Sequence, residues 1–219
     1  MSLKNNAVRA VLLLGVLTFV GSCGRFSSRF DRFHQNDDAP QSRNLVGSVC
    51  SDPRIKGEVI ASIPGRIAGC GVENPVRITS VSGVRLTQAA TVNCETATAL
   101  NDWVNNGIKP AVGRRGGGLE ALKVVAHYAC RTRNNQAGAR ISEHGKGRAI
   151  DIAAIILANG DTITVLDGWR NRRDGKILRA MHASACGPFG TVLGPEANRF
   201  HQDHFHVDTA SYRSGPYCK

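Results

Sequence analysis

The chain has 219 residues, of which 28 are lysine or arginine and 17 are aspartate or glutamate, so its formal net charge is +11. Hydrophobic residues make up 42% and charged residues 21%, which excludes a wholly disordered, collagen-like or multi-spanning membrane chain. The length suggests one domain with an appendage. Seven cysteines are unusual for a reducing cytosol, and because the number is odd, they cannot all pair within one secreted monomer.

The N-terminal segment has the order of an export signal. It begins with basic residues, continues with an apolar run over residues 10–20 and ends with small residues. The run is shorter than the roughly 20 residues that a spanning helix needs. Val20-Gly21-Ser22-Cys23 resembles the lipobox of bacterial lipoproteins, which implies a signal peptide over residues 1–22 and a lipidated Cys23 anchored in the outer membrane, facing the periplasm. Ordinary signal cleavage near the same place is the alternative.

The other six cysteines form an even set that suits three disulfides in an oxidising compartment. They are Cys50, Cys70, Cys94, Cys130, Cys186 and Cys218. A zinc-thiolate site is disfavoured because the sequence contains no Cys-x-x-Cys pair. The short separation favours Cys50 with Cys70, but the sequence does not fix the pairing.

Residues 23–49 carry no sustained apolar period, which predicts a flexible tether before a folded domain over residues 50–219. A short surface helix with Phe26, Phe30 and Phe33 is the alternative for part of the tether.

Periodicity within the domain predicts both strands and helices. Strands are expected within 75–86, where they flank a glycine-containing turn, and at 121–130, 149–156, 162–165, 191–193 and 204–208. Helices are expected at 94–106, with Trp103 in the core, and at 174–185, with His182 packed rather than acting as a ligand. The glycine-rich stretch 113–118 lacks the pattern of a phosphate loop and reads as a flexible basic loop. The mixture predicts an α+β fold with a small antiparallel sheet flanked by helices.

Two histidine clusters carry the candidate chemistry. In the first, His144 and Asp151 lie on either side of glycines that let the chain turn into a strand. In the second, strand alternation places His204 and His206 on one face. Together, His144, Asp151 and His206 supply three zinc ligands and leave a fourth position for water, which is typical of a catalytic site. A hydrogen-bonded surface patch of histidines is the alternative for the second cluster.

The motif Ser142-x-His144-x-x-Gly147-x-Ala149-x-Asp151, followed by His204-x-His206, resembles the lysostaphin, D-Ala-D-Ala metallopeptidase and hedgehog group. The triplet His201-x-x-His204-x-His206 is most similar to the penicillin-insensitive murein endopeptidase branch. Over most of residues 50–218, the chain resembles the bacterial extensin-like C-terminal domain family.

The resemblance implies a hedgehog/D-Ala-D-Ala-peptidase-like zinc fold that acts on peptidoglycan stem peptides. His204 would be the base and His201 a substrate contact or a support for His204. Asp203 stands where the carboxypeptidase branch has a glutamate, and it is the second choice for the base or an orienting carboxylate. Arg131 would stabilise the oxyanion, unless it pairs with an acidic residue.

The leading hypothesis is therefore a periplasmic, zinc-dependent peptidoglycan endopeptidase. The alternative is a non-catalytic zinc-containing domain that binds the wall or a protein partner. Nucleic-acid binding, which the basic charge suggests, is disfavoured by the export signal, the cysteines and the lack of an aromatic stacking motif. The sequence does not decide between D,D cross-links, L,D cross-links and a terminal D-alanine.

Overall fold

The computed structural model describes residues 47–212 and 214–219. The expected signal peptide, Cys23 and the phenylalanine-rich segment lie outside these residues. In the part of the chain that is described, no helix is both long and apolar enough to cross a membrane.

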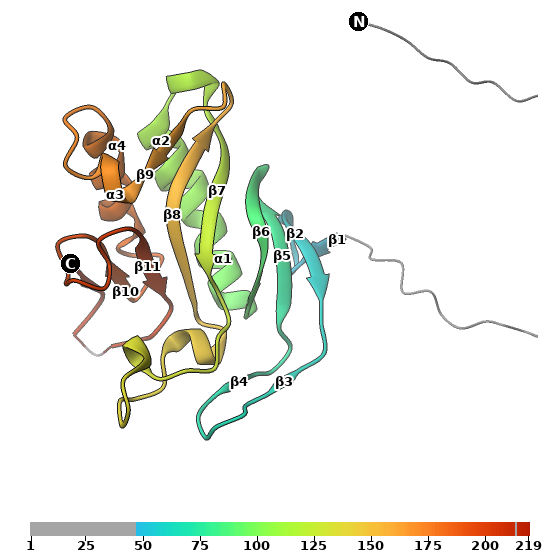
Figure 1. Ribbon diagram of the computed structural model, residues 1–219. Helices are drawn as coiled ribbons and strands as arrows, with labels where there is room; N and C mark the ends of the chain where they lie inside the picture. Colours follow the sequence, from blue (N-terminus) through green and yellow to red (C-terminus); the bar gives the residue numbers. More distant parts are fainter. Residues whose placement is uncertain (1–46, 213) are drawn as a thin grey trace, which may run out of the picture. The chain divides into compact units, whose positions relative to one another are not determined.

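A ten-stranded mixed sheet forms the centre of the fold (Figure 1). Its strands are β1 (Gly47–Val49), β2 (Asp52–Val59), β5 (Val76–Val81), β6 (Val84–Val92), β7 (Leu119–Ala126), β8 (Ala149–Leu157), β9 (Thr162–Thr164), β10 (Thr191–Leu193), β11 (Phe205–Asp208) and β12 (Tyr217–Cys218). Their order is β1-β2-β5-β6-β7-β8-β11-β10-β12, and β9 also pairs with β8. Strands β3 (Ile63–Pro64) and β4 (Gly71–Val72) form a separate two-stranded sheet.

The α+β class is confirmed, but the expected small antiparallel sheet is wrong in size, and the observed sheet is mostly rather than wholly antiparallel. Two of its neighbouring pairs, β6 with β7 and β10 with β12, are parallel. A parallel pair needs a long crossover, and the helical segment between β6 and β7 provides one of these connections. The additional size comes mainly from strands before residue 75, which were not predicted.

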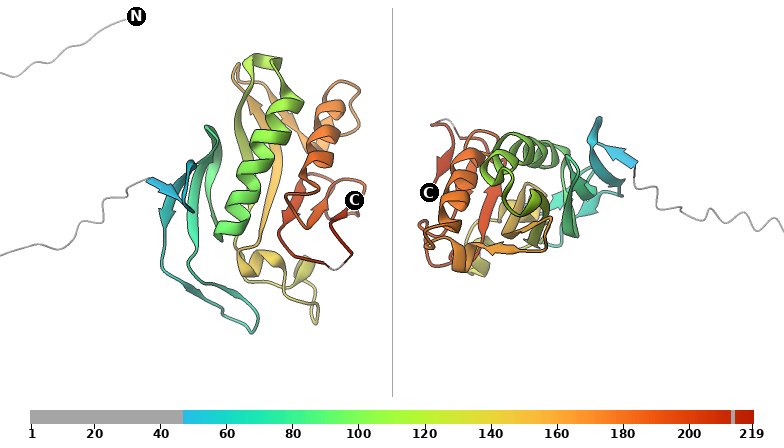
Figure 2. Two further views of the ribbon diagram at one scale, coloured as in Figure 1. Left: turned by 180° about the vertical axis from the view of Figure 1, so that it is seen from behind. Right: turned by 90° about the horizontal axis from the view of Figure 1, so that it is seen from above.

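Helices cover one face of the sheet, as Figure 2 shows from behind. Helix α1 (Cys94–Trp103) continues through a π-helical turn at Val104–Ile108 into the short α2 (Lys109–Val112). Helix α3 (Val165–Gly168) precedes the longer α4 (Asp174–Ala185). The π-helical turn and α4 approach closely, since a Cβ at Gly107 would lie 2.3 Å from the Ser184 hydroxyl. Only glycine fits at this crossing.

The core lies between the sheet and these helices. Trp103 is fully buried, as predicted, and its indole Nε1 donates a hydrogen bond to the Met181 carbonyl at 2.9 Å. His182 packs against Trp169 and Phe205, which confirms its expected packing role. Strand β8 is buried along most of its length and is apolar except for Asp151. A charged side chain in such a strand needs compensating partners.

Agreement with the predicted elements is closest where the apolar period is uninterrupted. Helix α4 and strand β10 have the predicted bounds, and β8 extends one residue beyond its prediction. The strands and glycine-containing turn expected within 75–86 are confirmed: the segment holds all of β5 and the start of β6, and the chain turns between them at Ser82-Gly83. The predicted strand 121–130 ends early, at Ala126, and residues 127–131 leave the sheet.

Three disulfides join the six cysteines, as expected, but Cys50 does not pair with Cys70. The pairs are Cys50–Cys94, Cys70–Cys130 and Cys186–Cys218. Proximity in sequence misled here because β2 carries the chain away from Cys50, and the β5–β6 hairpin brings it back at the start of α1.

Candidate metal centre

Three segments bring the predicted ligands together. His144 lies on a 3-10 turn at Glu143–Lys146, Asp151 on β8, and His206 on β11 directly opposite Asp151 in the strand pairing. Gly147 turns the chain from the first segment into the second with a φ of 66°, and a Cβ there would lie 2.8 Å from the Val72 side chain. Both the backbone angle and the space favour glycine at this position.

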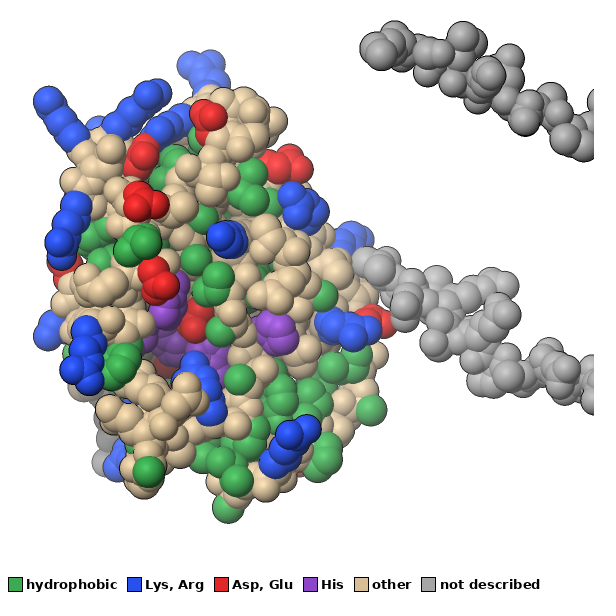
Figure 3. Space-filling model, in the orientation of Figure 1, with side chains coloured by type: hydrophobic (Ala, Val, Ile, Leu, Met, Phe, Trp, Pro, Cys, Tyr) green, Lys and Arg blue, Asp and Glu red, His purple; other side chains and the backbone are tan. Residues whose placement is uncertain are grey.

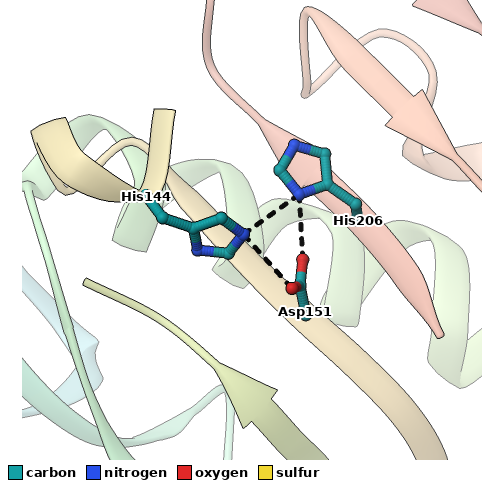
Figure 4. Close-up of side chains that lie close together, drawn as sticks. All are labelled: His144, Asp151 and His206. Atoms are coloured by element: carbon teal, nitrogen blue, oxygen red, sulfur yellow. Dashed lines mark hydrogen bonds and ion pairs between the residues drawn. The ribbon is translucent and has the colours of Figure 1, made fainter. Parts of the chain in front are cut away.

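The donor atoms of the three residues face one another (Figure 4). His144 Nε2 lies 3.2 Å from Asp151 Oδ2 and 3.2 Å from His206 Nδ1, and His206 Nδ1 lies 2.9 Å from Asp151 Oδ1. Zinc bonds of about 2.0–2.1 Å in a tetrahedron place ligand atoms about 3.3–3.4 Å apart. The two histidine nitrogens are therefore spaced almost as two corners of such a tetrahedron, and Asp151 directs one oxygen toward each of them.

Outer hydrogen bonds fix which nitrogen of each ring faces the centre. His144 Nδ1 donates to the His127 carbonyl at 2.8 Å, and His206 Nε2 donates to Asp208 Oδ2 at 3.0 Å. In the neutral rings, the inner nitrogens then carry lone pairs and no hydrogen. Two lone pairs and the Asp151 carboxylate would then repel one another unless a positive charge, from a proton or a metal ion, lies between them.

Asp208 is a candidate supporting residue of the centre that the sequence analysis missed. It is buried, and its other carboxylate oxygen accepts a hydrogen bond from the Ala210 amide at 2.9 Å. Carboxylates behind histidine ligands orient the ring and raise its basicity. Its position two residues after His206, on the same strand face, was the signal that could have identified it.

The electrostatics of the metal-free centre agree with this need for positive charge. Burial tends to raise the pKa of Asp151, but hydrogen bonds from His144 and His206 lower it well below its usual range. Burial likewise opposes protonation of His206, but its hydrogen bonds with Asp151 and Asp208 raise its pKa to about 9. A proton thus occupies the centre unless a metal ion replaces it, and the donor set fits zinc.

A cavity of about 470 Å³ opens from this centre to the surface. Figure 3 shows histidine side chains in the hollow that it forms. Six of the seven residues predicted for the site line it: His144, Asp151, His206, His204, His201 and Arg131. The seventh, Asp203, does not. The exposed aromatic side chains of Phe200, Tyr212 and Tyr217 complete its rim.

His204 and Asp203 form a pair at the edge of the centre. His204 Nδ1 donates to Asp203 Oδ1 at 2.8 Å, and His204 Nε2 lies 3.7 Å from Asp151 Oδ2. The Asp203 side chain is 65% exposed, whereas that of His204 is 17% exposed. The structure therefore turns the free nitrogen of His204 toward the centre and holds the other nitrogen with a carboxylate.

His201 and Arg131 lie farther out in the same cavity. The His201 ring is buried, with Nδ1 2.8 Å from Asn198 Oδ1 and its centroid 5.2 Å from that of His204. Burial, together with the neighbouring histidines, lowers its pKa to about 4. Arg131 donates only a long hydrogen bond, 3.4 Å, to the Thr132 carbonyl. Among the described residues it has no ion pair, so the alternative of an acidic partner is not seen.

Comparisons with known proteins reach only the level of the family. No curated protein matches the chain. No solved structure matches it either. A family model described as the extensin-like protein C-terminus matches residues 52–219. That match covers almost the whole described region, including both histidine clusters and five of the six paired cysteines, the exception being Cys50. The chain therefore belongs to the family of extensin-like protein C-termini.

Proposed function

We propose that the chain is a zinc-dependent peptidoglycan endopeptidase that hydrolyses cross-links between stem peptides in the bacterial envelope. The observation that carries the proposal is the convergence of His144, Asp151 and His206 at the floor of an open cavity. Structural zinc sites are closed by four protein ligands, whereas catalytic sites have three and an open position. Three ligands beside an accessible cavity support the catalytic reading.

A zinc ion held by these three residues would polarise the scissile carbonyl and lower the pKa of an attacking water toward neutrality. The protein supplies the rest of the chemistry. His204 is placed to take the proton of the attacking water on Nε2 and to pass it to the leaving amine. General acid–base transfer of this kind contributes typically about 10²- to 10⁴-fold to a rate.

Asp203 supports His204 as an orienting carboxylate. Because its oxygen accepts the Nδ1 proton of His204, the Nε2 atom keeps a lone pair directed toward the centre. We therefore prefer His204 to Asp203 as the base, since the Asp203 carboxylate contacts the far side of that ring.

Arg131 and His201 serve the substrate in this proposal. The Arg131 guanidinium is available to stabilise the oxyanion that forms as the carbonyl is attacked. His201 lies behind His204 and supports its ring or contacts the peptide. The cavity volume is in the range that small-molecule and peptide sites occupy.

The proposed location is the periplasm, with lipidated Cys23 as an outer-membrane anchor and residues 23–49 as a tether. Three disulfides in the folded part of the chain support an oxidising compartment. An anchored enzyme would act on a polymer that cannot diffuse to it.

A defined soluble substrate tests the proposal. Purified mature protein loaded with zinc is incubated with cross-linked muropeptide dimers, and the products are separated and weighed by mass spectrometry. We expect monomers whose masses identify the D,D or L,D bond that was cut, and we expect none with His204→Ala. The proposal is wrong if zinc-loaded protein releases no monomer, and binding of the dimer without cleavage would favour the non-catalytic alternative.

A further inference from the structure

Basic side chains gather around the start of α4, away from the metal centre. Residues 169–179 contain five basic residues and one acidic residue, Asp174. The glycine-rich loop 113–118 adds two more arginines, and the ion pair between Arg115 and Asp174 holds this loop against the start of α4. In Figure 3, blue side chains stand out along the upper left of the molecule, the region of α2, α3 and α4 in Figure 1.

We call this surface the basic patch and define it by five exposed side chains: Arg114, Arg170, Arg172, Arg173 and Lys176. Among the ion pairs of the described residues, none involves any of these five. The only carboxylate within residues 169–179 already pairs with Arg115. The patch therefore presents several uncompensated cations to solvent.

The local electrostatics disfavour this arrangement in the isolated protein. Arg172, Arg173 and Lys176 surround the first turn of α4, which is the positive end of the helix dipole, where cations are destabilising. Crowded like charges add a further repulsion. An external anion would relieve both effects, and arginine is suited to bind planar carboxylates through two parallel hydrogen bonds.

The patch lies at the opposite end of β8 from the metal centre. The backbone amides of Ala158 and Asn159, just beyond β8, donate to the carbonyls of Gly118 and Gly116. Asp151 and Leu157 are six residues apart on that strand, a distance of about 20 Å at 3.3 Å per residue. A ligand that reaches both places must be long, and the part of it that lies at the patch must carry negative groups.

We infer that the basic patch docks the domain on the carboxylates of peptidoglycan stem peptides, at a site separate from the metal centre. The inference rests on the proposed function, which supplies a polymer with repeated carboxylates. A membrane surface fits less well because segments that insert into a membrane interface place an apolar face beside the charges. Within the described residues, Leu166 is the one large exposed apolar side chain near the patch.

Two triple variants test the docking role. The patch variant carries three substitutions that remove three charges: Arg170→Gln, Arg172→Gln and Arg173→Gln. None of the three arginine side chains makes a hydrogen bond within the described residues. The control variant loses the same number of charges from exposed positions elsewhere, through Lys56→Gln, Arg66→Gln and Arg85→Gln. Thermal unfolding of both variants confirms that they fold.

Both variants and the unmodified mature protein are pelleted with intact sacculi at increasing NaCl concentrations. We expect the patch variant to bind about tenfold more weakly at low salt, from three exposed ion pairs of modest strength, and the control to bind as the unmodified protein does. High salt should remove the difference. Equal binding by all three proteins, or an equal loss in both variants, would overturn the inference.

Two further arms separate the alternatives. Vesicles that contain anionic phospholipid replace the sacculi in one arm, and a loss of vesicle binding without a loss of sacculus binding would assign the patch to lipid and contradict the inference. Soluble muropeptide dimers are the substrate in the other arm, where the patch variant should retain the full cleavage rate. If no protein cleaves the dimer, the proposed function fails, while the pelleting result still decides the docking role.

Discussion

The His206 ring lies between two carboxylates, with Nδ1 2.9 Å from Asp151 Oδ1 and Nε2 3.0 Å from Asp208 Oδ2. The inner carboxylate is a proposed metal ligand, and the outer one determines which nitrogen of the ring is free to bind. The centre therefore depends on a residue that does not itself face the metal.

Asp208→Asn should weaken zinc binding about 10- to 100-fold, which is typical for the loss of a carboxylate behind a histidine ligand. The reason is that a neutral amide no longer raises the basicity of the His206 ring. Competition with a chromophoric chelator measures the affinity. Asp203→Asn is the matched control, because Asp203 contacts His204 and not a proposed ligand. Equal zinc affinity in Asp208→Asn and the unmodified protein would contradict the orienting role.

His204→Ala should retain zinc and lose about 10²- to 10⁴-fold in the rate of muropeptide cleavage. Asp203→Asn should lose far less, because it changes only the support of the ring. Metal content and cleavage rate, measured on the same preparations, separate a lost base from a lost metal. If Asp203→Asn is as inactive as His204→Ala and both retain zinc, the claim that Asp203 only supports the ring is wrong.

Zinc affinity should fall as the pH is lowered. In the metal-free protein, burial opposes the charge on His206, yet Asp151 and Asp208 raise its pKa to about 9. Because this pKa is above the ordinary value of about 6.5, the proton stabilises the metal-free fold below pH 6.5, and that contribution is lost as the pH rises through 9. Zinc must displace the proton, so its affinity should weaken by about tenfold per pH unit between pH 8 and pH 7. Chelator competition at the two pH values checks this, and a constant affinity would count against it.

Loss of the Cys186–Cys218 disulfide should destabilise the fold. The bond closes a loop with a sequence separation of 32 and joins the end of α4 to β12 at the edge of the sheet. Loop-closure entropy predicts a loss of about 3–4 kcal/mol in the free energy of unfolding for Cys186→Ser with Cys218→Ser. Urea denaturation measures this change. An unchanged free energy of unfolding would show that the loop is held by its other contacts.

The sequence predicted those parts of the fold in which one local pattern dominates. The spacing of Ile177, Leu178 and Met181 on one face predicted α4, and the near-continuous apolar run around Asp151 predicted β8. Strands β1 to β4 were missed because they are short or carry few buried side chains, as in β2, where only Ile55 and Gly57 are buried. Of these four, β1 and β2 extend the main sheet, which is why its size was not predicted.

The candidate ligands could be selected from sequence because His144, Asp151 and His206 are of metal-binding types in a recognisable order. The support of His144 could not, since the His127 carbonyl reaches that ring only through the fold. The disulfide partner of Cys50 was hidden for the same reason. Pairing across a sheet is a property of the tertiary arrangement, not of distance along the chain.

The most direct measurement of the central claim is the conversion of cross-linked dimers into monomers within intact sacculi. The sacculi are treated with one preparation of the mature protein in three states, zinc-loaded, stripped by a chelator and reloaded with zinc, and are then digested to muropeptides that are separated and weighed. His144→Ala is the variant without a complete ligand set, and His182→Gln is the matched control, with a histidine that packs away from the centre. We expect fewer dimers and more monomers after treatment with the loaded protein, the reloaded protein and His182→Gln, and no change with the stripped protein or His144→Ala. Conversion that is equal in all three states, or absent from all of them, would contradict a zinc-dependent peptidase.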